Sequence, residues 1–260
     1  MITLSVHTRQ RLLSASALIG FFVLWEMVCL AFNVSDLILP RPSQIAKVLI
    51  EKMPLLWPHA VQTLYTTITG FVFGVVAGIF IGIAIGSSKL IYDVTYPLLV
   101  GFSSIPKVAV VPLFVVWFGA GTVPAILTSM VISVFPVVVN VAAGLASTEP
   151  ELEDVLRVLG ARKCDILWNV GLPRSLPYLF ASLKIAITLS FVGTVLAETV
   201  ASNKGIGTVM MIASGNFDVA LVFAGLFLLA AMGVALYALS SLVEQRMTGW
   251  SQRKIDVAMQ

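Results

Sequence analysis

Residues 147–177 read STEPELEDVLRVLGARKCDILWNVGLPRSLP, a polar and charged segment between two long apolar ones. Its first half places Leu152, Val155, Leu156 and Leu159 at i, i+3, i+4 and i+7, the spacing of one face of a helix. A protein that crosses a bilayer does not need such an amphipathic element for its own stability. We therefore interpret this polar segment as a surface that another protein binds.

The polar segment carries its own start and stop signals. Thr148 and the glutamate three residues later fit a capping box at the start of the first helix. Gly160 is expected to end that helix, and a second short helix is expected to run to about Val170. Leu172 and Pro173 would then stop the second helix. The pattern predicts a small helical hairpin.

The composition of the whole chain indicates a membrane protein. Of its 260 residues, 58% are apolar and 11% are charged, and the mean hydropathy is +1.00. Soluble domains carry about 25% charged residues, so this chain lacks the polar side chains for a solvated surface. The net charge of +3 is small and dispersed, which argues against a nucleic-acid partner. Cys29 and Cys164 lie far apart, so a disulfide framework is not expected.

Six apolar segments are long enough to cross a membrane, since about 20 residues span its hydrocarbon core. They lie at about 18–34, 60–87, 96–118, 123–146, 179–200 and 219–243. Only four residues separate the third segment from the fourth, which predicts a tight hairpin. The basic residues before the first segment resemble a signal peptide, but the run is long and is interpreted as a retained helix. The sequence predicts one all-α, multi-pass transmembrane domain over residues 1–260.

The distribution of lysine and arginine predicts the orientation of the chain. With both termini inside, the inner side holds Arg9, Arg11, Lys89, Arg157, Arg162, Lys163, Arg174, Arg246, Arg253 and Lys254. The outer side then holds Arg41, Lys47, Lys52 and Lys204. This bias satisfies the positive-inside rule. Both termini and the polar segment are therefore predicted to be cytoplasmic.

The second apolar segment carries glycines at strict four-residue spacing. They are Gly70, Gly74, Gly78, Gly82 and Gly86. Each lets a neighbouring backbone approach closely. Four residues turn a helix by about 400°, so the track drifts by about 40° per step. We expect either a right-handed crossing with one helix or successive contacts with two. Packing alone is favoured over a surface that slides between two states.

Charged side chains inside a membrane are costly and point to function. Lys107 lies between Pro106 and Pro112, which interrupt the helix and free carbonyl groups. A cation in a broken helix suits an anionic or polar solute, and an ion pair with Glu198 or Glu26 is the equal alternative.

Further polar residues in the spans have two interpretations each. Asn140 is expected to bond a neighbouring helix more readily than a solute. Glu198 precedes a glycine-bearing loop that is either part of an outer gate or a simple turn. Lys184 is expected to extend toward the inner surface.

Catalytic patterns are missing from the sequence. It contains no phosphate-binding G-x-x-x-x-G-K-[ST] loop, so ATP binding by this chain is not expected. His7 and His59 are isolated, and no cysteine and histidine group has the spacing of metal ligands. Energy for any transport must come from an ion gradient or from another protein.

The polar segment resembles the cytoplasmic "EAA" loop of ABC-importer permeases, with the pattern E-A-A, three residues, G, nine residues, I-x-L-P. Residues 154–156 (Asp-Val-Leu) occupy the E-A-A position, Gly160 the glycine, Val170 the isoleucine, and Leu172 and Pro173 the final pair. Other motifs resemble the nitrate/sulfonate/taurine-type permeases. They are LPRPS at 39–43, IPK at 105–107, PLF at 112–114, WFG at 117–119, AE at 197–198 and GIG at 205–207.

This resemblance implies a type I (MetI-like) importer permease fold in the bacterial inner membrane. Two permease chains, the second expected to be identical, would form the pathway, and a periplasmic solute-binding protein would deliver a small anionic or polar organic solute. The segment 147–177 would insert as a coupling helix into an ATPase subunit, present in two copies. ATP and Mg would bind that partner, and no cofactor or metal is expected here. The implied coupling residues are Glu153, Asp154, Val155, Leu156, Arg157, Leu159, Gly160 and Ala161.

The candidate residues of the solute path are Lys107, Asn140 and Glu198. A self-contained secondary carrier or channel is the competing hypothesis, with Glu26 and Glu198 as its only deep carboxylates. It leaves the amphipathic polar segment unexplained, and no inverted repeat is evident. A membrane scaffold without transport would not need an interrupted span that carries a lysine.

Overall fold

The structure is a computed structural model that describes residues 6–147 and 150–258. For residues 6–12, 150, 151, 153, 163, 164 and 248–258 it describes the backbone alone. Thr148, the predicted start of the first polar helix, lies outside the described residues, as do the side chains of Glu151 and Glu153. The described chain is helical throughout, with no strand, which confirms the predicted all-α class.

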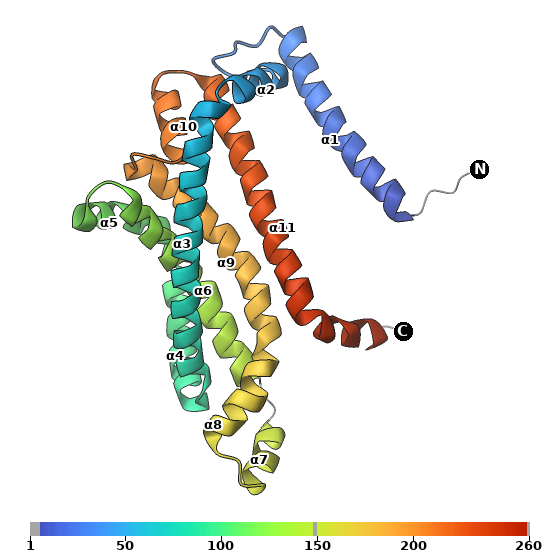
Figure 1. Cartoon of the computed structure of the whole chain (residues 1–260), viewed down its shortest axis with the longest axis vertical. Coiled ribbons are helices and arrows are strands. Elements are labelled where there is room, and N and C mark those ends of the chain that lie inside the picture. Colours follow the sequence, from blue (N-terminus) through green and yellow to red (C-terminus); the bar gives the residue numbers. More distant parts are fainter. Residues whose placement is uncertain (1–5, 148–149, 259–260) are drawn as a thin grey trace.

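Most of the helices pack into one elongated bundle (Figure 1). The first half of the chain forms α1 (Val6–Ala31), α2 (Pro42–Glu51), α3 (Met53–Gly86), α4 (Lys89–Ser103), the 3-10 turn η1 (Lys107–Val110), α5 (Val111–Phe118) and α6 (Thr122–Ala146). The second half forms α7 (Pro150–Val158), α8 (Lys163–Ile166), the π-helical turn η2 (Leu167–Gly171), α9 (Leu172–Ala201), α10 (Ile206–Gly215) and α11 (Val219–Ala258).

Three long helices, α3, α6 and α9, pack against one another and make the centre of the bundle. Helices α2 and α10 lie at one end, here called the α2 end, and α7 and α8 lie at the opposite α7 end (Figure 1). Helix α11 runs beside α9, whereas α1 lies apart from the bundle at its start and meets α11 through an aromatic contact nearer its C-terminal end (Figure 1). That contact places Trp25 against Phe223 and Phe227.

Five helices are long and apolar enough to cross a membrane: Leu13–Ala31, Met53–Gly86, Thr122–Ala146, Leu167–Ala201 and Val219–Met247. A sixth crossing is possible only if Lys89–Ser103 and Lys107–Phe118 act as one span, and that pair is bent by 76°. The predicted third span at 96–118 lies within this bent pair, and its predicted interruption at Pro106 is confirmed, since α4 ends at Ser103 and η1 begins at Lys107. The short connection to the fourth span is confirmed, since α5 ends at Phe118 and α6 begins at Thr122.

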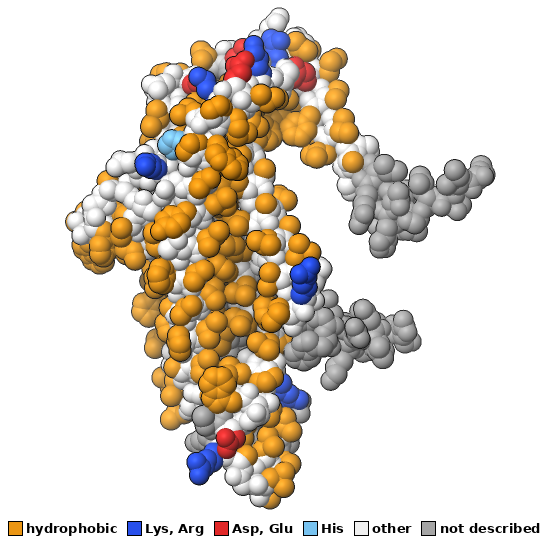
Figure 2. All heavy atoms as spheres, viewed as in Figure 1, with side chains coloured by type: hydrophobic (Ala, Val, Ile, Leu, Met, Phe, Trp, Pro, Cys, Tyr) orange, Lys and Arg blue, Asp and Glu red, His pale blue; other side chains and the backbone are white. Residues whose placement is uncertain are grey.

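The surface of the bundle suits a lipid environment. Large apolar side chains cover the visible face, and charged side chains collect mainly toward the two ends (Figure 2). Phe80 of α3, for example, is 71% exposed. A surface of this kind is stable only where hydrocarbon replaces water.

The glycines of α3 all contact one helix, α6. A Cβ atom at Gly78 or Gly82 would lie 2.7 Å from the Cβ of Val137 or Val141, and a Cβ at Gly70 would overlap Ser129. Of the two alternatives expected from the sequence, successive contacts with two helices are therefore wrong, and the crossing with one helix is confirmed. A helix that follows a track turning about 40° per step takes a right-handed path around α3. The two helices also run in the same direction, because partner numbers rise together.

Hydroxyl groups connect the three central helices where their backbones approach. The hydroxyls of Ser129 on α6 and Ser190 on α9 share a hydrogen bond, and each lies 3.3 Å from the carbonyl oxygen of Thr67 on α3. All three residues are fully buried. Hydrogen bonds between small polar residues of this kind stabilise helix packing inside membranes.

We expect Gly78→Ala to destabilise the protein. Alanine favours a helix over glycine by about 1 kcal/mol, but its Cβ would meet the Cβ of Val137 at 2.7 Å, and such overpacking costs about 1–3 kcal/mol. The measurement is the thermal unfolding midpoint in detergent, followed by size-exclusion chromatography.

Gly101→Ala on α4 is the matched control, because no atom lies within 4 Å of its added Cβ. Equal unfolding midpoints for the two variants would contradict the close contact between α3 and α6.

Candidate functional site

The polar segment forms a short helix that ends in a complete glycine cap. Gly160 has a left-handed backbone with φ +87°. Its N–H donates to the carbonyl oxygen of Arg157 (3.0 Å), and the N–H of Ala161 donates to that of Leu156 (3.0 Å). These two bonds define a Schellman motif with Gly160 at the C′ position. The predicted break at Gly160 is confirmed.

Several apolar side chains of α7 face outward. Val158 and Leu159 are 87% and 76% exposed, Val155 is also exposed, and Leu156 is half-buried. Asp154 and Arg157 form an exposed ion pair of 3.4 Å on the same helix. An exposed apolar strip beside charged groups is typical of a surface that binds a partner.

The second half of the polar segment differs from the predicted hairpin. Leu172 and Pro173 do not stop a helix: α8 continues through the π turn η2 directly into α9, which begins at Leu172. Proline is tolerated in the first turn of a helix because its missing N–H is not needed there. Asp165 accepts a hydrogen bond from the backbone N–H of Arg162 (3.0 Å) and so caps α8.

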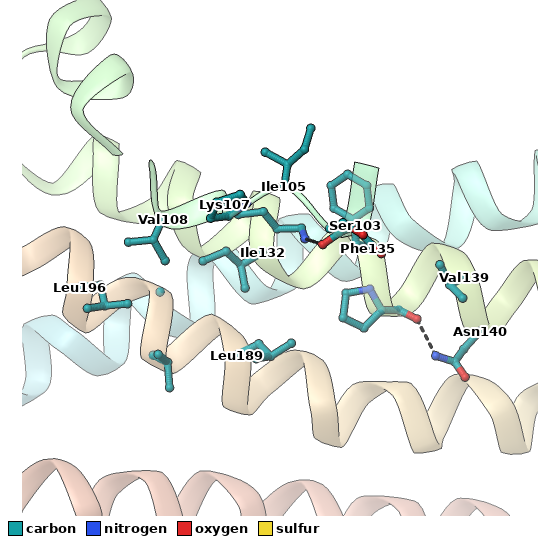
Figure 3. Close-up of a pocket in the computed structure, with 15 residues that line it drawn as sticks. Ser103, Ile105, Lys107, Val108, Ile132, Phe135, Val139, Asn140, Leu189 and Leu196 are labelled. Atoms are coloured by element: carbon teal, nitrogen blue, oxygen red, sulfur yellow. Dashed lines mark hydrogen bonds between the residues drawn. The ribbon is translucent and has the colours of Figure 1, made fainter. Parts of the chain in front are cut away.

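A cavity of about 530 Å³ lies beside the break between α4 and η1 (Figure 3). The end of α4, η1, α6 and α9 form its walls, and most of the lining side chains are apolar. Lys107 and Asn140 both line it. The structure thus brings these two predicted residues to one cavity, although they lie far apart in sequence.

Lys107 is held by its own broken helix. Its Nζ donates a hydrogen bond to the carbonyl oxygen of Ser103 (2.7 Å) and lies 4.7 Å from the ring centroid of Phe135 (Figure 3). The break leaves this carbonyl for the lysine, and the ring face attracts the ammonium group. In the described part of the chain, the side chain is therefore positioned without an acidic partner.

Asn140 bonds its own helix rather than a neighbour, contrary to the expectation from sequence. Its Nδ2 donates to the carbonyl oxygen of Pro136, one turn earlier on α6 (2.8 Å). This bond holds the amide against α6 at the edge of the cavity (Figure 3).

Glu198 and Glu26 lie elsewhere, and each accepts hydrogen bonds from neighbouring groups. Glu198 is 2% exposed and does not line the cavity. Its Oε2 accepts hydrogen bonds from the Thr63 hydroxyl (2.9 Å) and the Gly207 N–H (3.1 Å). Glu26 on α1 accepts from the Ser43 N–H (3.1 Å) and hydroxyl (2.8 Å), at the start of α2. Among the described residues, neither carboxylate pairs with Lys107.

Lys184 has an acidic partner on a neighbouring helix. It forms an ion pair with Glu244 of α11, and its extension toward the inner surface stays a prediction. The two side chains are 25% and 14% exposed. Pairing lowers the cost of placing both charges at membrane depth.

A multi-span helical bundle with a lysine-lined cavity at a broken helix, and an exposed helix at one end, has the construction of a transport protein. Residues 70–249 match the family of binding-protein-dependent transport system inner membrane components. The chain belongs to this family, and it is a multi-pass permease subunit of an ABC importer in the inner membrane.

Three curated relatives match most of the chain. The riboflavin transport system permease protein RibX of Chloroflexus aurantiacus is 31% identical over 88% of this chain and 86% of its own length. The formylaminopyrimidine transport permease protein ThiX of Halalkalibacterium halodurans is 28% identical over 89% and 93%. The taurine transport system permease protein TauC of Escherichia coli is 28% identical over 94% and 91%.

A solved structure supports the same fold. An inward-facing conformation of the MetNI methionine ABC transporter matches with a TM-score of 0.66 and 20% identity. The match covers 76% of this chain and 98% of that chain. The predicted MetI-like permease fold is confirmed.

Sequence reasoning did not identify all residues that build these sites. Phe135, which lies under the ammonium group of Lys107, is one of many aromatic residues in apolar spans and carries no distinguishing signal. Thr63 and Gly207, the partners of Glu198, belong to other helices. The GIG sequence at 205–207 was the one visible hint, since two glycines so close indicate a crowded backbone.

Proposed function

We propose that the cavity beside the α4 break is part of the solute path of this permease. Its walls are mostly apolar, and Lys107 supplies one cation at their edge. That combination suits a small organic solute with an apolar body and one anionic or polar group. The relatives named for riboflavin, formylaminopyrimidine and taurine transport favour the same solute class.

The polar segment 147–177 is proposed as the coupling element for a separate ATPase. The observation that carries this assignment is the Schellman-capped α7, which presents Val155, Val158 and Leu159 to the exterior at the α7 end. The proposed contact residues are Glu153, Asp154, Val155, Leu156, Arg157, Leu159, Gly160 and Ala161. ATP and Mg would bind the partner ATPase, and no cofactor is assigned to this chain.

The complete importer is proposed to contain two copies of this chain, two ATPase subunits and a periplasmic solute-binding protein. The α7 end and both termini would face the cytoplasm, as the excess of basic residues on that side favours. The α2 end would then receive the binding protein. A second copy would close the open side of the cavity.

We expect Gly160→Val to uncouple ATP hydrolysis from uptake, or to release the ATPase subunit. The left-handed backbone at Gly160 is costly for a β-branched residue, by about 1–2 kcal/mol or more. Losing the cap would redirect the chain after α7. The measurement is ATPase activity and solute uptake by the complete importer in proteoliposomes.

Gly160→Asn is the matched control, because asparagine tolerates left-handed geometry and an added Cβ meets no atom within 4 Å. We expect this variant to retain most coupling. Normal uptake by Gly160→Val at normal abundance would contradict the coupling role.

We expect Lys107→Met to reduce uptake by about tenfold or more, because the loss of one charged hydrogen bond to solute costs about 1.5–3 kcal/mol. Assembly should be unchanged, since the lysine pairs only with a local carbonyl and ring. Uptake is measured with radiolabelled solute, and assembly by co-purification of the ATPase.

Lys89→Met, at the exposed start of α4, is the control and should transport normally. If Lys107→Met transports as well as this control, the lysine serves only the structure of the broken helix.

A further inference from the structure

Glu198 lies at the centre of a buried hydrogen-bonded group at the α2 end of the bundle. This group, the Glu198 cluster, consists of Glu198 on α9, Thr63 and His59 on α3, and Gly205 and Gly207 at the start of α10. Glu198 is 2% exposed and Thr63 is fully buried. The cluster therefore joins three helices through polar contacts in a site closed to water.

The contacts of the cluster satisfy the free backbone donors at the start of α10. The N–H of Ile206 donates to the Thr63 hydroxyl (2.9 Å), and the N–H of Gly207 donates to Glu198 (3.1 Å). The N–H of Gly205 donates to Nδ1 of His59 (3.0 Å). The first N–H groups of a helix have no partner within it. Here two other helices supply all three acceptors.

Gly205 and Gly207 have no room for a larger residue, because Glu198 occupies the space beside them. A Cβ at Gly205 would overlap the Glu198 carboxyl group, and a Cβ at Gly207 would lie 2.8 Å from the Glu198 Cβ. Gly205 also has φ +125°, which side chains rarely adopt. The start of α10 is thus shaped to the carboxyl group.

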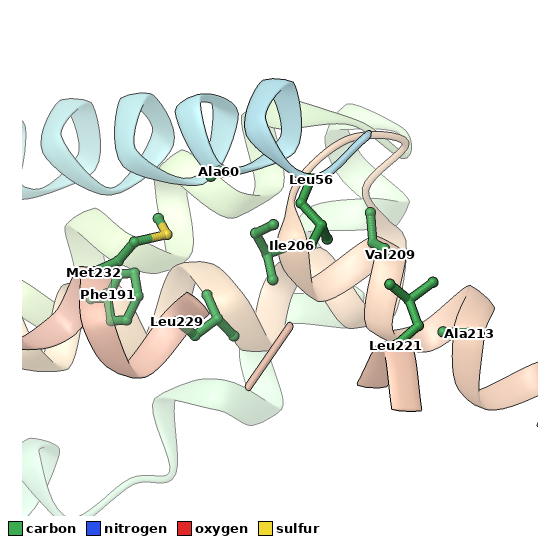
Figure 4. Packing of buried hydrophobic residues seen from close by; sticks show 9 residues of the cluster. All are labelled: Leu56, Ala60, Phe191, Ile206, Val209, Ala213, Leu221, Leu229 and Met232. Carbon is green, nitrogen blue, oxygen red and sulfur yellow. The ribbon is translucent and has the colours of Figure 1, made fainter. Parts of the chain in front are cut away.

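Apolar packing extends the same junction. Ile206 is fully buried in a cluster with Leu56 and Ala60 of α3, Phe191 of α9, and Leu229 of α11 (Figure 4). Polar and apolar contacts therefore both hold Ile206, the first residue of α10, in place.

The opposite face of α9 lines the cavity. Leu196 lies on the cavity wall, and Glu198, two residues later, points about 200° away around the helix. The residues that hold α9 to α10 and the residues that form the wall thus belong to one short stretch of helix. The position of the wall depends on the Glu198 cluster.

We propose that Glu198 is a positioning residue that fastens α3 and α10 to α9, so that α9 forms a fixed wall of the cavity. Its role in transport rests on the function proposed above. The opposite wall contrasts with it, because α4 has no buried residue and the chain bends by 76° at its end. Opening of the cavity then moves the end of α4 against the α9 wall, which stays in place.

The test is hydrogen exchange of the α10 backbone amides in the assembled importer, reconstituted in nanodiscs. Thr63→Val keeps the side-chain volume but removes the acceptor of Ile206 and a donor to Glu198. If the cluster fastens the helix as a unit, amides at 210–215 should exchange about tenfold faster, since the loss of a hydrogen bond to a buried charged group costs about 1.4 kcal/mol or more, which is a factor of ten. These amides bond within α10, so their response reports release of the whole helix.

Three further variants separate positioning from general loss of stability. Thr66→Val is the matched control: Thr66 is also buried on α3, and its hydroxyl bonds only to Gln62 of the same helix. Glu198→Ala should release α10, and Glu198→Gln should restore its protection, because the amide oxygen can still accept from Thr63 and Gly207.

Unchanged exchange at 210–215 in both Thr63→Val and Glu198→Ala would overturn the proposal, and so would equal acceleration in Thr66→Val or failure of Glu198→Gln to restore protection. Exchange does not depend on the solute path. If the cavity does not carry solute, Lys107→Met will show normal uptake. The exchange rates of the α10 amides would be the same in either case.

Discussion

The direct contact between the backbones of α3 and α6 determines the arrangement of the bundle. Glycine at every fourth position of α3 removes the side chains that would separate the two helices, and each of these glycines faces α6. Because the helices run in the same direction, the chain must cross back between them. The segment containing α4, η1 and α5 makes that return, and its break at Pro106 places Lys107 against α6. The cavity is thus a consequence of how the return segment meets a closely packed pair.

Charged groups at membrane depth are each held by nearby partners. Glu26 accepts hydrogen bonds at the start of α2, Lys107 bonds a free carbonyl group, and Lys184 pairs with Glu244. Burial of a charge without such partners would cost several kcal/mol. These hydrogen bonds and this ion pair hold helix ends in place and join neighbouring helices. Most of the charged residues within the spans of the described chain therefore have a structural role. Of these four, Lys107 alone lines the candidate path, beside a cavity with apolar walls.

The sequence predicted features that depend on neighbours in the chain. Gly160 was identified as a helix end because glycine readily adopts the left-handed backbone of the cap, and the interruption near Lys107 followed from Pro106. The effect of Leu172 and Pro173 was misjudged because a π turn before α9 accepts the proline as the first turn of a new helix. The partners of Glu198 are 135 and nine residues away. Such pairings depend on tertiary packing, which a local pattern does not record.

The register between α3 and α6 also limits how this protein changes during evolution. The residues opposite the glycines recur with the same four-residue spacing, as serine at 129 and 133 and valine at 137 and 141. A larger residue at one of these glycines would meet its counterpart 59 positions later and, at Gly70 and Gly74, also a backbone carbonyl oxygen of α6, so it requires a change on both helices. Each such pair must change together, while lipid-facing positions on the same helices vary independently. The line of contact between the two helices is therefore more tightly constrained than their lipid-facing surfaces.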